Sequence, residues 1–517
     1  MKLNSICSSI FLVCLTIGFV GCKNGLDDYI PPAIQPHTDS GNGNPDDNTD
    51  FNNLGITPHQ DGTPYDTFKG LIMCGYQGWF GTPDDGSLLT KQERCYYHYQ
   101  EHGQFRPGVM KNSIDFWPDM SEYEKQYTVG EEVPNANSSP FILPNGKKAT
   151  VFSPYDKSSV LLHFNWMKQY GIDGVFMQRF VGEISGATHK EHFDKVLDNA
   201  MEGSNTYQRA ISVMYDLSGA KEEGWKLMVK DAQELMDKYA LKDRTRQRFY
   251  LYQNGKPLLA LWGIGFNDTS HPTATKIKPY VDQLKQQGWS IMLGCPAYWR
   301  MGGNDCVSGT EHTALINLIK ECDAFIPWYV GRYDYSNFSG TDWQNRIRLD
   351  ISTAKTYANV VYATHVYPGG SDRNMHPNNG LDVENTDNTG GRYGGKFYWQ
   401  QFYQDIKNGV EAIYVGMFDE MDEGTAIFKQ LNTKDVPSNI YDGPDYYVTY
   451  KRGGSYDIST DVKTGDNVIW SRLATSLKVN FQGIDNNLPT DHYLWLTGQA
   501  AKMLNGQIRM TETIPDR

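Results

Sequence analysis

The protein has 517 residues, of which 39% are hydrophobic and 21% are charged, and this composition excludes an intrinsically disordered or collagen-like chain. The formal net charge of −13 argues against a nucleic-acid-binding protein, because a surface that follows phosphates needs an excess of basic residues. Aromatic residues make up 13% of the chain, which is typical of proteins that bind the flat faces of sugars or bases.

The first 21 residues have the pattern of a bacterial secretory signal. Lys2 supplies a positive start, and Ile10–Val20 is an apolar core too short to span a bilayer, which needs about 20 residues. Phe19-Val20-Gly21-Cys22 resembles a lipobox, which predicts that residues 1–21 are removed and that Cys22 carries lipid. The alternative is an ordinary signal peptide with an incidental cysteine.

Asp, Asn, Gly and Pro dominate the next segment, which predicts a flexible tether over residues 22–62. A flexible chain of about 35 residues reaches about 30 Å, enough to hold a domain clear of lipid headgroups. We therefore expect a lipid-anchored protein of the cell envelope, at the outer membrane, on its periplasmic or its surface-exposed face. The rest of the chain, residues 63–517, is predicted to form one catalytic domain.

Cysteine usage fits an envelope protein that does not depend on disulfides. Of the 8 cysteines, those outside the signal and the lipid site are Cys74, Cys95, Cys295, Cys306 and Cys322. An odd number leaves at least one thiol unpaired, and CxxC and HExxH are both missing from the sequence. The sequence therefore predicts no zinc or other metal site, and it contains no pattern that calls for an organic cofactor.

Short apolar runs alternate with amphipathic helical patterns along residues 63–517. The eight predicted strands are Gly70–Tyr76, Ile172–Gln178, Ala210–Tyr215, Pro257–Trp262, Trp289–Gly294, Ala324–Trp328, Asn359–Val366 and Glu411–Phe418. Eight strands, each followed by a helix, predict an α/β fold of the (β/α)8 TIM barrel type. The alternative is an open doubly wound sheet, but GxGxxG is absent after the first strand.

Two connections are longer than a bare barrel requires. They run from Gln77 to Pro154 after the first strand and from Gly424 to about Leu488 after the eighth. Connections that follow barrel strands lie over the carboxyl ends of the strands, where barrel active sites lie. We therefore expect these two segments to shape a binding cleft.

Nearly every predicted strand ends in an aromatic or polar side chain. The resulting candidates for substrate binding are Tyr76, Gln77, Trp79, Gln178, Arg179, Asp216, Trp262, Tyr298, Trp328, Tyr329 and His365. A single ring at such a position is often only a filler of the barrel's top layer. Repetition at most strand ends favours a ligand with apolar C–H faces and hydroxyl groups, which describes a carbohydrate.

The eighth strand delivers four carboxylates in a short segment: Asp419, Glu420, Asp422 and Glu423. Glycosidic cleavage needs one group that protonates the departing oxygen and a second carboxylate that assists attack. Glu420 and Glu423 are three residues apart, which allows both to lie on one side of a helical turn, so we assign catalysis to this pair. The alternatives are acids that favour a helix N-terminus, and a calcium site.

The segment Phe418-Asp419-Glu420-Met421-Asp422-Glu423-Gly424-Thr425 resembles the strand-eight segment of glycoside hydrolase family 99, the endo-acting α-mannosidases and α-mannanases. It also resembles the related family 71/99-like group of bacterial lipoproteins. Further segments similar to that group are Gly75–Phe80, Asp115–Asp119, Gly171–Phe176 and Leu488–Leu496. Met421-Asp422 stand where family 99 has Trp-His between its glutamates.

The resemblance implies a retaining mechanism in which the two glutamates have different roles. Glu423 would protonate the leaving oxygen and later act as a base. Glu420 would remove the proton of the sugar 2-hydroxyl, which attacks its own anomeric carbon to form a 1,2-anhydro sugar. This route requires a 2-hydroxyl anti to the leaving group, as in α-mannosides, and it uses no cofactor.

We therefore predict a glycosidase for an α-linked, α-mannan-like oligo- or polysaccharide, which binds no nucleic acid and needs no obligate protein partner. The alternative is a carbohydrate-binding surface lipoprotein that has lost catalysis, which the changed Met421-Asp422 pair keeps open. Gly390–Phe397 resembles a P-loop, but Phe397 replaces the required Ser or Thr, so nucleotide binding is not predicted. No GxSxG is present, which argues against a serine hydrolase.

Overall fold

The computed structural model describes residues 56–130, 137–338, 341–377, 391–477 and 479–517. The predicted signal peptide, Cys22 and the predicted tether up to residue 55 lie outside the described residues. The end of that tether lies against the barrel, because Asp61 pairs with Lys168 at 2.6 Å and with Arg209 at 2.5 Å. Within the described part of the chain, no helix is long and apolar enough to cross a membrane.

Eight parallel strands close into a barrel, and they are the eight that the sequence predicts, with ends shifted by a few residues. Their bounds are β1 (Ile72–Tyr76), β4 (Gly174–Phe180), β5 (Ala210–Asp216), β7 (Lys256–Trp262), β8 (Ser290–Pro296), β9 (Ala324–Trp328), β10 (Val361–Val366) and β11 (Ala412–Val415). The neighbours run β5-β4-β1-β11-β10-β9-β8-β7, and pairing of β5 with β7 closes the ring. The prediction of a (β/α)8 barrel is confirmed, and closure excludes the open doubly wound sheet.

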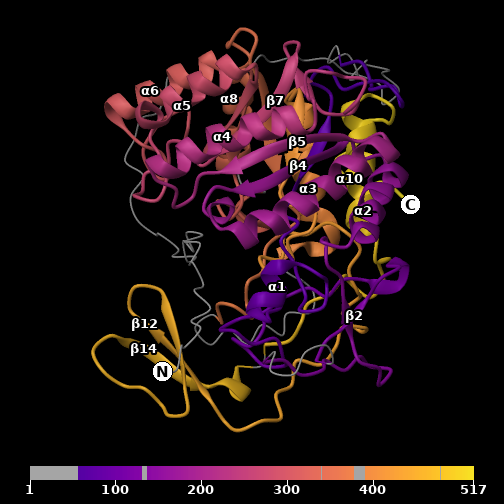
Figure 1. Ribbon diagram of the computed structural model, residues 1–517, viewed down its shortest axis with the longest axis vertical. Helices are drawn as coiled ribbons and strands as arrows, with labels where there is room; N and C mark the ends of the chain where they lie inside the picture. Colours follow the sequence, from indigo (N-terminus) through magenta and orange to yellow (C-terminus); the bar gives the residue numbers. More distant parts are fainter. Residues whose placement is uncertain (1–55, 131–136, 339–340, 378–390, 478) are drawn as a thin grey trace, which may run out of the picture.

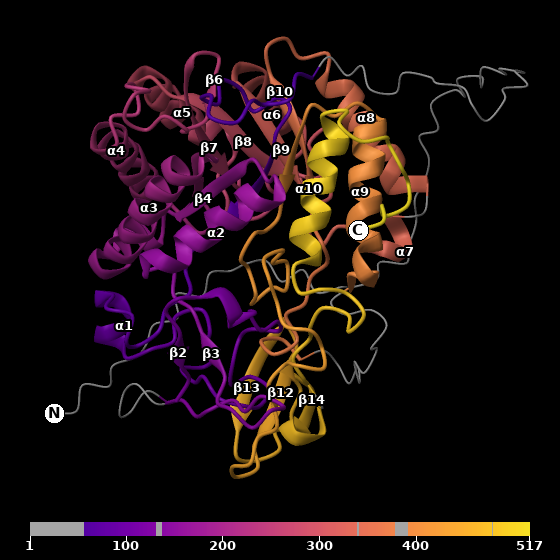
Figure 2. The same cartoon turned by 90° about the vertical axis from the view of Figure 1, so that its right-hand side faces the viewer.

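A helix follows each barrel strand and covers the outside of the barrel (Figures 1 and 2). These helices are α2 (Lys157–Tyr170), α3 (Ala187–Tyr207), α4 (Glu222–Lys238), α5 (Ala274–Gln287), α6 (Gly309–Glu321), α8 (Thr341–Ala354), α9 (Lys396–Lys407) and α10 (His492–Leu504). Local sequence fixes their ends: Asp156 accepts the Ser158 N–H at the start of α2, and Gly171, with φ of +77°, ends it. The smaller elements between strands and helices are η2 (Glu183–Ser185), β6 (Tyr252–Gln253), α7 (Tyr335–Phe338) and η4 (Tyr393–Gly395).

Side chains alternate between the inside and the outside of the barrel along each strand. On β4, Phe176 packs in the barrel interior, whereas Val175 and Met177 belong to the layer beneath the helices. The same period places Gln178 on the inner side and Arg179 on the outer side of the strand end. This alternation decides which of the predicted strand-end residues face the barrel opening.

The two long connections form a second body at the carboxyl ends of the strands, drawn below the barrel in Figure 1. The first contains α1 (Leu88–Glu93), η1 (Met120–Glu122), β2 (Tyr127–Thr128) and β3 (Thr150–Val151). The second contains β12 (Tyr447–Lys451), β13 (Ser455–Ser459), β14 (Val468–Leu473) and η5 (Ala474–Ser476). They are joined by bridges between Phe116 and Gln482 and between Pro118 and Gln430, so one layer covers the barrel end.

Arg179, which the sequence favoured for substrate binding, instead joins the barrel wall to two helices. Its guanidinium donates to Asp231 of α4 at 2.6 and 2.7 Å and to Asp194 of α3 at 2.6 Å. Burial alone would raise the pKa of Asp231, yet the hydrogen bonds and charge of Arg179 lower it. Because Arg179 lies on the outer face and its Nε and Nη2 donors are engaged by Asp231 and Asp194, a substrate contact does not fit its position.

Removing one charge of this buried pair tests its structural role. We expect Asp231→Asn to lower the free energy of unfolding by about 3–5 kcal/mol, because the buried Arg179 guanidinium would lose its main counter-charge. The matched control is Lys226→Ala, which breaks an exposed ion pair on the same helix and should leave the free energy nearly unchanged. Urea unfolding, monitored by circular dichroism, measures the free energy of unfolding of both variants. If both lose the same small amount, the structural role of the Arg179–Asp231 pair is contradicted.

Candidate active site

The acidic turn, Asp419–Thr425, follows β11 and ends in a Schellman motif. The Gly424 N–H donates to the Met421 carbonyl at 3.3 Å, and the Thr425 N–H donates to the Glu420 carbonyl at 3.1 Å. Gly424 has φ of +65°, and a Cβ there would lie 2.6 Å from the Ser371 nitrogen, so only glycine fits. The chain therefore makes a single helical turn that carries Glu420 at its start and Glu423 at its end.

Distant segments hold the backbone of this turn. The Asp115 N–H donates to the Met421 carbonyl at 3.2 Å, and the Ser371 N–H donates to the Glu423 carbonyl at 2.8 Å. The buried Asp115 carboxylate in turn accepts the Ser371 hydroxyl and the Arg373 N–H. One carboxylate in the first long connection thus ties the loop after β10 to the acidic turn.

Arg392 holds the far end of the turn from the loop before α9. Its Nη2 donates to the carbonyl oxygens of Gly424 at 2.8 Å and of Ala426 at 2.7 Å. The guanidinium lies over the rings of Phe116 at 4.3 Å and Tyr493 at 4.6 Å, and only 1% of the residue is exposed. Burial lowers the pKa of Arg392 to about 10, so it remains charged at neutral pH. The charged guanidinium therefore strengthens the hydrogen bonds to the Gly424 and Ala426 carbonyls, at the point where the chain leaves the turn.

The first two carboxylates of the acidic turn have buried hydrogen-bond partners. Asp419 accepts the backbone N–H groups of Gln77 at 2.7 Å and Gly78 at 2.9 Å, one on each oxygen. Glu420 accepts the Gln77 amide nitrogen at 2.6 Å and the Thr425 hydroxyl at 2.5 Å. Asp419 thus anchors the turn to the end of β1, whereas Glu420 is oriented by two side chains that do not carry charge.

Burial raises the pKa of three carboxyls in the turn. The pKa of Asp419 rises to about 7, partly offset by its two N–H donors. Burial, and after it the charge of Asp422, raises the pKa of Glu420. The hydrogen bonds from Thr425 and Gln77 lower this pKa in part. The pKa of Asp422 also rises through burial. The turn therefore holds protons near neutral pH, and a Glu420 carboxylate, once ionised, is a stronger base than an exposed one.

The other two acids of the turn, Asp422 and Glu423, have different surroundings. Asp422 is bonded to Nδ1 of His98 at 3.0 Å, and burial lowers the pKa of this histidine to about 3. Glu423 is partly exposed. No group of three or more potential metal ligands occurs among the described residues, and both oxygens of Asp419 already accept N–H donors. The calcium interpretation thus has no support in this geometry.

Several predicted binding residues occupy the inner positions at the strand ends, which we call the barrel mouth: Gln178, Asp216, Trp262, Trp328 and His365. Trp262 and Trp328 are partly exposed and meet edge to face, with ring centroids 5.0 Å apart. The ring of His365 lies 4.4 Å from Trp328. The mouth therefore offers aromatic surface beside the turn that follows β11.

Polar groups at the mouth have defined protonation states. His365 accepts the Tyr329 N–H on Nδ1 at 3.1 Å, so its Nε2 carries the hydrogen, and burial lowers its pKa to about 3. That Nε2 is buried and has no partner among the described residues. Burial raises the pKa of Asp216 to about 6, although the Ser218 N–H donates to it at 2.7 Å. A neutral N–H donor and a carboxyl beside aromatic rings suit a sugar with several hydroxyls.

Two predicted binding residues point away from the mouth, because they occupy outer positions. The Tyr76 hydroxyl is bonded to Nδ1 of His163 on α2 at 2.8 Å. The Tyr329 hydroxyl donates to Asp350 on α8 at 2.9 Å, and only its backbone N–H reaches the mouth. Their side chains fasten helices to the barrel, so substrate contact does not fit them.

Trp79 and Tyr298 have rings that other side chains cover. Trp79 is stacked on His98 at 3.8 Å and on Phe180 at 5.4 Å, and 3% of the residue is exposed. The guanidinium of Arg346 lies 3.9 Å above the ring of Tyr298. Stacking of a sugar on Trp79 does not fit this packing. Gln77, by contrast, touches Glu420 directly.

Sequence reasoning missed several groups that shape the site. Arg392 and His98 touch the acidic turn but belong to no strand end, and Thr425, quoted only within the segment that resembles the family, donates to Glu420. Asp115 lies in a segment noted only for its resemblance to the family, and Arg392 lies in the glycine-rich segment considered as a P-loop. Each of these two segments contains a charged residue that could have been singled out, but the sequence does not indicate which group that residue binds.

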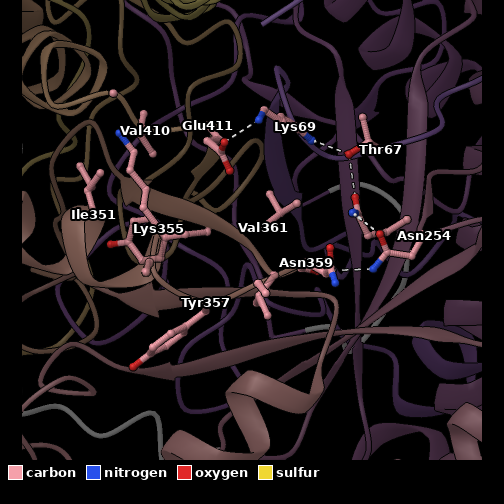
Figure 3. A pocket seen from close by; sticks show the side chains of 16 residues that line it. Thr67, Lys69, Asn254, Ile351, Lys355, Tyr357, Asn359, Val361, Val410 and Glu411 are labelled. Carbon is pink, nitrogen blue, oxygen red and sulfur yellow. Dashed lines mark hydrogen bonds and ion pairs between the residues drawn. The ribbon is translucent and has the colours of Figure 1, made fainter. Parts of the chain in front are cut away.

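A pocket of about 370 Å³ lies at the opposite, amino end of the barrel strands (Figure 3). Lys69 and Glu411 line it and pair with each other at 2.6 Å, and the Thr67 hydroxyl donates to Gln253 at 2.8 Å. Its charged groups are therefore engaged within the wall. Since (β/α)8 enzymes carry their chemistry at the carboxyl ends of the strands, the acidic turn is the better candidate.

No protein-family model and no curated protein matches the sequence. Among solved structures, the GH99 endo-α-mannosidase from Bacteroides thetaiotaomicron, in complex with bis-tris-propane, is 13% identical with a TM-score of 0.50, over 85% of this chain and 99% of that chain. A second structure of that enzyme has 14% identity, a TM-score of 0.46 and the same coverage. A family 39 glycoside hydrolase from Bacteroides cellulosilyticus has 9% identity and a TM-score of 0.34, over 63% of this chain and 78% of that chain. The first likeness shows that this chain shares the fold of a glycoside hydrolase.

Arg392 can be tested without any knowledge of the substrate. We expect Arg392→Lys to speed amide hydrogen exchange of the peptide that contains the acidic turn by about ten-fold or more. Lysine lacks the planar fork that holds two carbonyls, and a hydrogen bond to a charged group contributes about 1.5–3 kcal/mol. Hydrogen exchange with mass spectrometry measures the rate. Arg517→Lys, which changes an arginine that pairs with Asp491, is the control, and equal exchange in both variants would contradict the role.

Proposed function

We propose that the protein is a glycoside hydrolase that cleaves an α-linked glycan, of the α-mannan type or a related polysaccharide, with retention of configuration. Glu420 and Glu423 are the catalytic pair of this proposal. The observation that carries it is the acidic turn: two glutamates on one turn, fixed by distant donors at the carboxyl end of β11. That location is where barrel enzymes carry their catalytic groups.

The environments of the two glutamates support different roles. Glu420 is buried, hydrogen-bonded by Gln77 and Thr425, and has a raised pKa, which suits a base that must attract the proton of a weakly acidic hydroxyl. Glu423 is partly exposed at the end of the turn, where a leaving group and water can reach it. Groups whose environments differ in this way commonly divide acid and base work between them.

In the proposed first step, the Glu420 carboxylate takes the proton of the sugar 2-hydroxyl while the 2-oxygen bonds to the anomeric carbon. The bond from that carbon to the leaving oxygen breaks, and Glu423 gives its proton to this oxygen. In the second step, Glu423 takes a proton from water, whose oxygen attacks the anomeric carbon and opens the 1,2-anhydro sugar. Glu420 then returns its proton to the 2-oxygen. Two inversions at one carbon give net retention.

The barrel mouth supports a carbohydrate substrate. Trp262 and Trp328 offer partly exposed rings, and the buried Nε2 of His365 is a donor without a partner among the described residues. A hydroxyl that meets such a donor is favoured, because an unpaired buried donor is costly. The choice of an α-mannan-like glycan rests on the resemblance of the acidic turn and on the fold shared with an endo-α-mannosidase.

Glutamine variants of the two glutamates test this proposal. We expect Glu420→Gln and Glu423→Gln to lower kcat on α-mannan by about 10²–10⁴-fold, because each loses a proton-transfer group. Glu423→Gln should recover activity on an aryl α-mannoside with a good leaving group, which needs no protonation, whereas Glu420→Gln should not. Glu411→Gln, at the amino end of the barrel, is the matched control and should keep its activity. The measurement is initial rates on both substrates.

Two results would contradict the proposal. Full activity in either variant would remove that glutamate from the site. Binding of α-mannan by the wild type without turnover on any α-glycan would favour a carbohydrate-binding protein that has lost catalysis. Calorimetric titration of the wild type with α-mannan, run beside the rate measurements, separates this outcome from a protein that does not recognise mannan.

We also propose that the protein is held in the cell envelope through lipid on Cys22. The support is the sequence pattern Phe19-Val20-Gly21-Cys22 after an apolar stretch. We expect Cys22→Ala to move the protein from the membrane fraction to the soluble fraction, because the lipid that anchors it would be lost. Cys95→Ala, at a buried thiol of the barrel-end layer, is the control. Membrane fractionation followed by immunoblotting measures the distribution. A Cys22→Ala variant that stays in the membrane fraction would contradict the lipid anchor.

A further inference from the structure

The three-stranded sheet of the second long connection, whose strands are labelled in Figure 2, carries three aromatic side chains that we call the aromatic row. Tyr450 on β12 pairs directly with Tyr456 on β13 and with Trp470 on β14, so the three side chains lie on one face. The ring centroids of Tyr450 lie 5.0 Å from Tyr456 and 5.8 Å from Trp470. All three residues are partly exposed.

The rest of the sheet explains why this row is left partly open. The adjacent pair on the same face, Val448 and Ile458, packs on Val109 and Met110 and attaches the sheet to the body. Tyr456 and Trp470 also pack against this cluster with part of their surface, whereas Tyr450 does not, and the row lies next to the hairpin tip between β12 and β13. At the tip, a Cβ built on Gly453 would meet no atom within 4 Å. Tyr450 thus exceeds what attachment of the sheet requires, and the exposed parts of Tyr456 and Trp470 lie beside it.

The opposite face of the same strands has a different chemistry. Thr449 and Ser471 share a hydrogen bond of 2.7 Å between hydroxyls, and Lys451 pairs with Asp457 at 3.0 Å. Ile469, at the register shift in β14, is an exposed apolar residue, at 49%. One face is therefore an ordinary polar surface, and the other presents rings of the kind that bind sugar faces.

A short loop connects the aromatic row to the acidic turn. At its start, the Ser371 N–H donates to the carbonyl of Glu423 at 2.8 Å. At its end, the Tyr456 hydroxyl donates to the Pro377 carbonyl at 3.2 Å, and the ring of His376 lies 5.7 Å from that of Tyr456. The row is thus continuous, through residues 371–377, with the rim of the candidate active site.

We propose that Tyr450, Tyr456 and Trp470 form a remote binding face for the same glycan chain, which they hold by stacking on sugar rings several units from the bond that is cleaved. The occupant is a long, uncharged polysaccharide, because the row offers ring faces rather than a cluster of like charges. The position of the cleaved bond rests on the proposed function of the acidic turn. Binding to the row itself does not require catalysis.

Replacement of the rings separates binding of a long glycan from chemistry at the turn. We expect Trp470→Leu and Tyr450→Leu to weaken the affinity for polymeric α-mannan by at least about five-fold, because the flat stacking face is lost while apolar volume is kept. Affinity for an α-linked mannose disaccharide, and turnover of an aryl α-mannoside, should stay unchanged. The matched control is Ile469→Ala, at an exposed apolar residue of β14 outside the aromatic row. Calorimetric titration of the full chain measures the affinities.

Each outcome decides the proposal. Tyr450 lies outside the apolar cluster beneath the sheet, so Tyr450→Leu keeps the test valid if Trp470→Leu fails to fold. Wild-type affinity of Tyr450→Leu for the polymer, or an equal loss in Ile469→Ala, would overturn the remote face. A wild type that binds mannan through the row without cleaving it would refute the hydrolase assignment and uphold the face. A wild type that neither binds nor cleaves α-mannan would overturn both.

Discussion

The candidate site depends on the fixed backbone of the acidic turn. Its carbonyl oxygens at Met421, Glu423 and Gly424 accept hydrogen bonds from groups in three other segments of the chain: the N–H of Asp115, the N–H of Ser371 and the guanidinium of Arg392. A buried carbonyl without such a partner costs about 1–3 kcal/mol, so loss of these donors would release the turn. The fold itself therefore sets the backbone positions of the two glutamates, and this is the pre-organisation that the proposed proton transfers require.

The two long connections surround the acidic turn. The first brings Asp115 and Phe116 to the turn and to Arg392, which also lies against Tyr493 of α10, and the carboxyls of Asp419, Glu420 and Asp422 are buried. Burial raises the pKa of Asp419 and Glu420 above that of an unfolded chain. Each group therefore contributes less to stability as pH rises from its unfolded pKa through its folded pKa. Burial of these two carboxyls therefore costs the folded protein some stability at neutral pH.

The sequence predicts the fold well, because eight buried parallel strands leave continuous apolar runs that need no knowledge of partners. It also locates the acidic turn at the end of the eighth strand. It does not predict which strand-end residues face inward, because a shift of one residue reverses every side chain: Gln178 faces the mouth and Arg179 does not. Arg392 was missed for another reason, since its partners are backbone carbonyls, which leave no trace in side-chain patterns.

We propose that Glu420 and Glu423 together cleave an α-glycosidic bond with two inversions at the anomeric carbon. Proton NMR of the wild-type reaction on α-mannan, recorded before mutarotation mixes the anomers, identifies the configuration of the first-formed product. We expect a new reducing end in the α configuration, which later equilibrates. A product that appears first in the β configuration would contradict this mechanism and would require a water held between the two carboxylates.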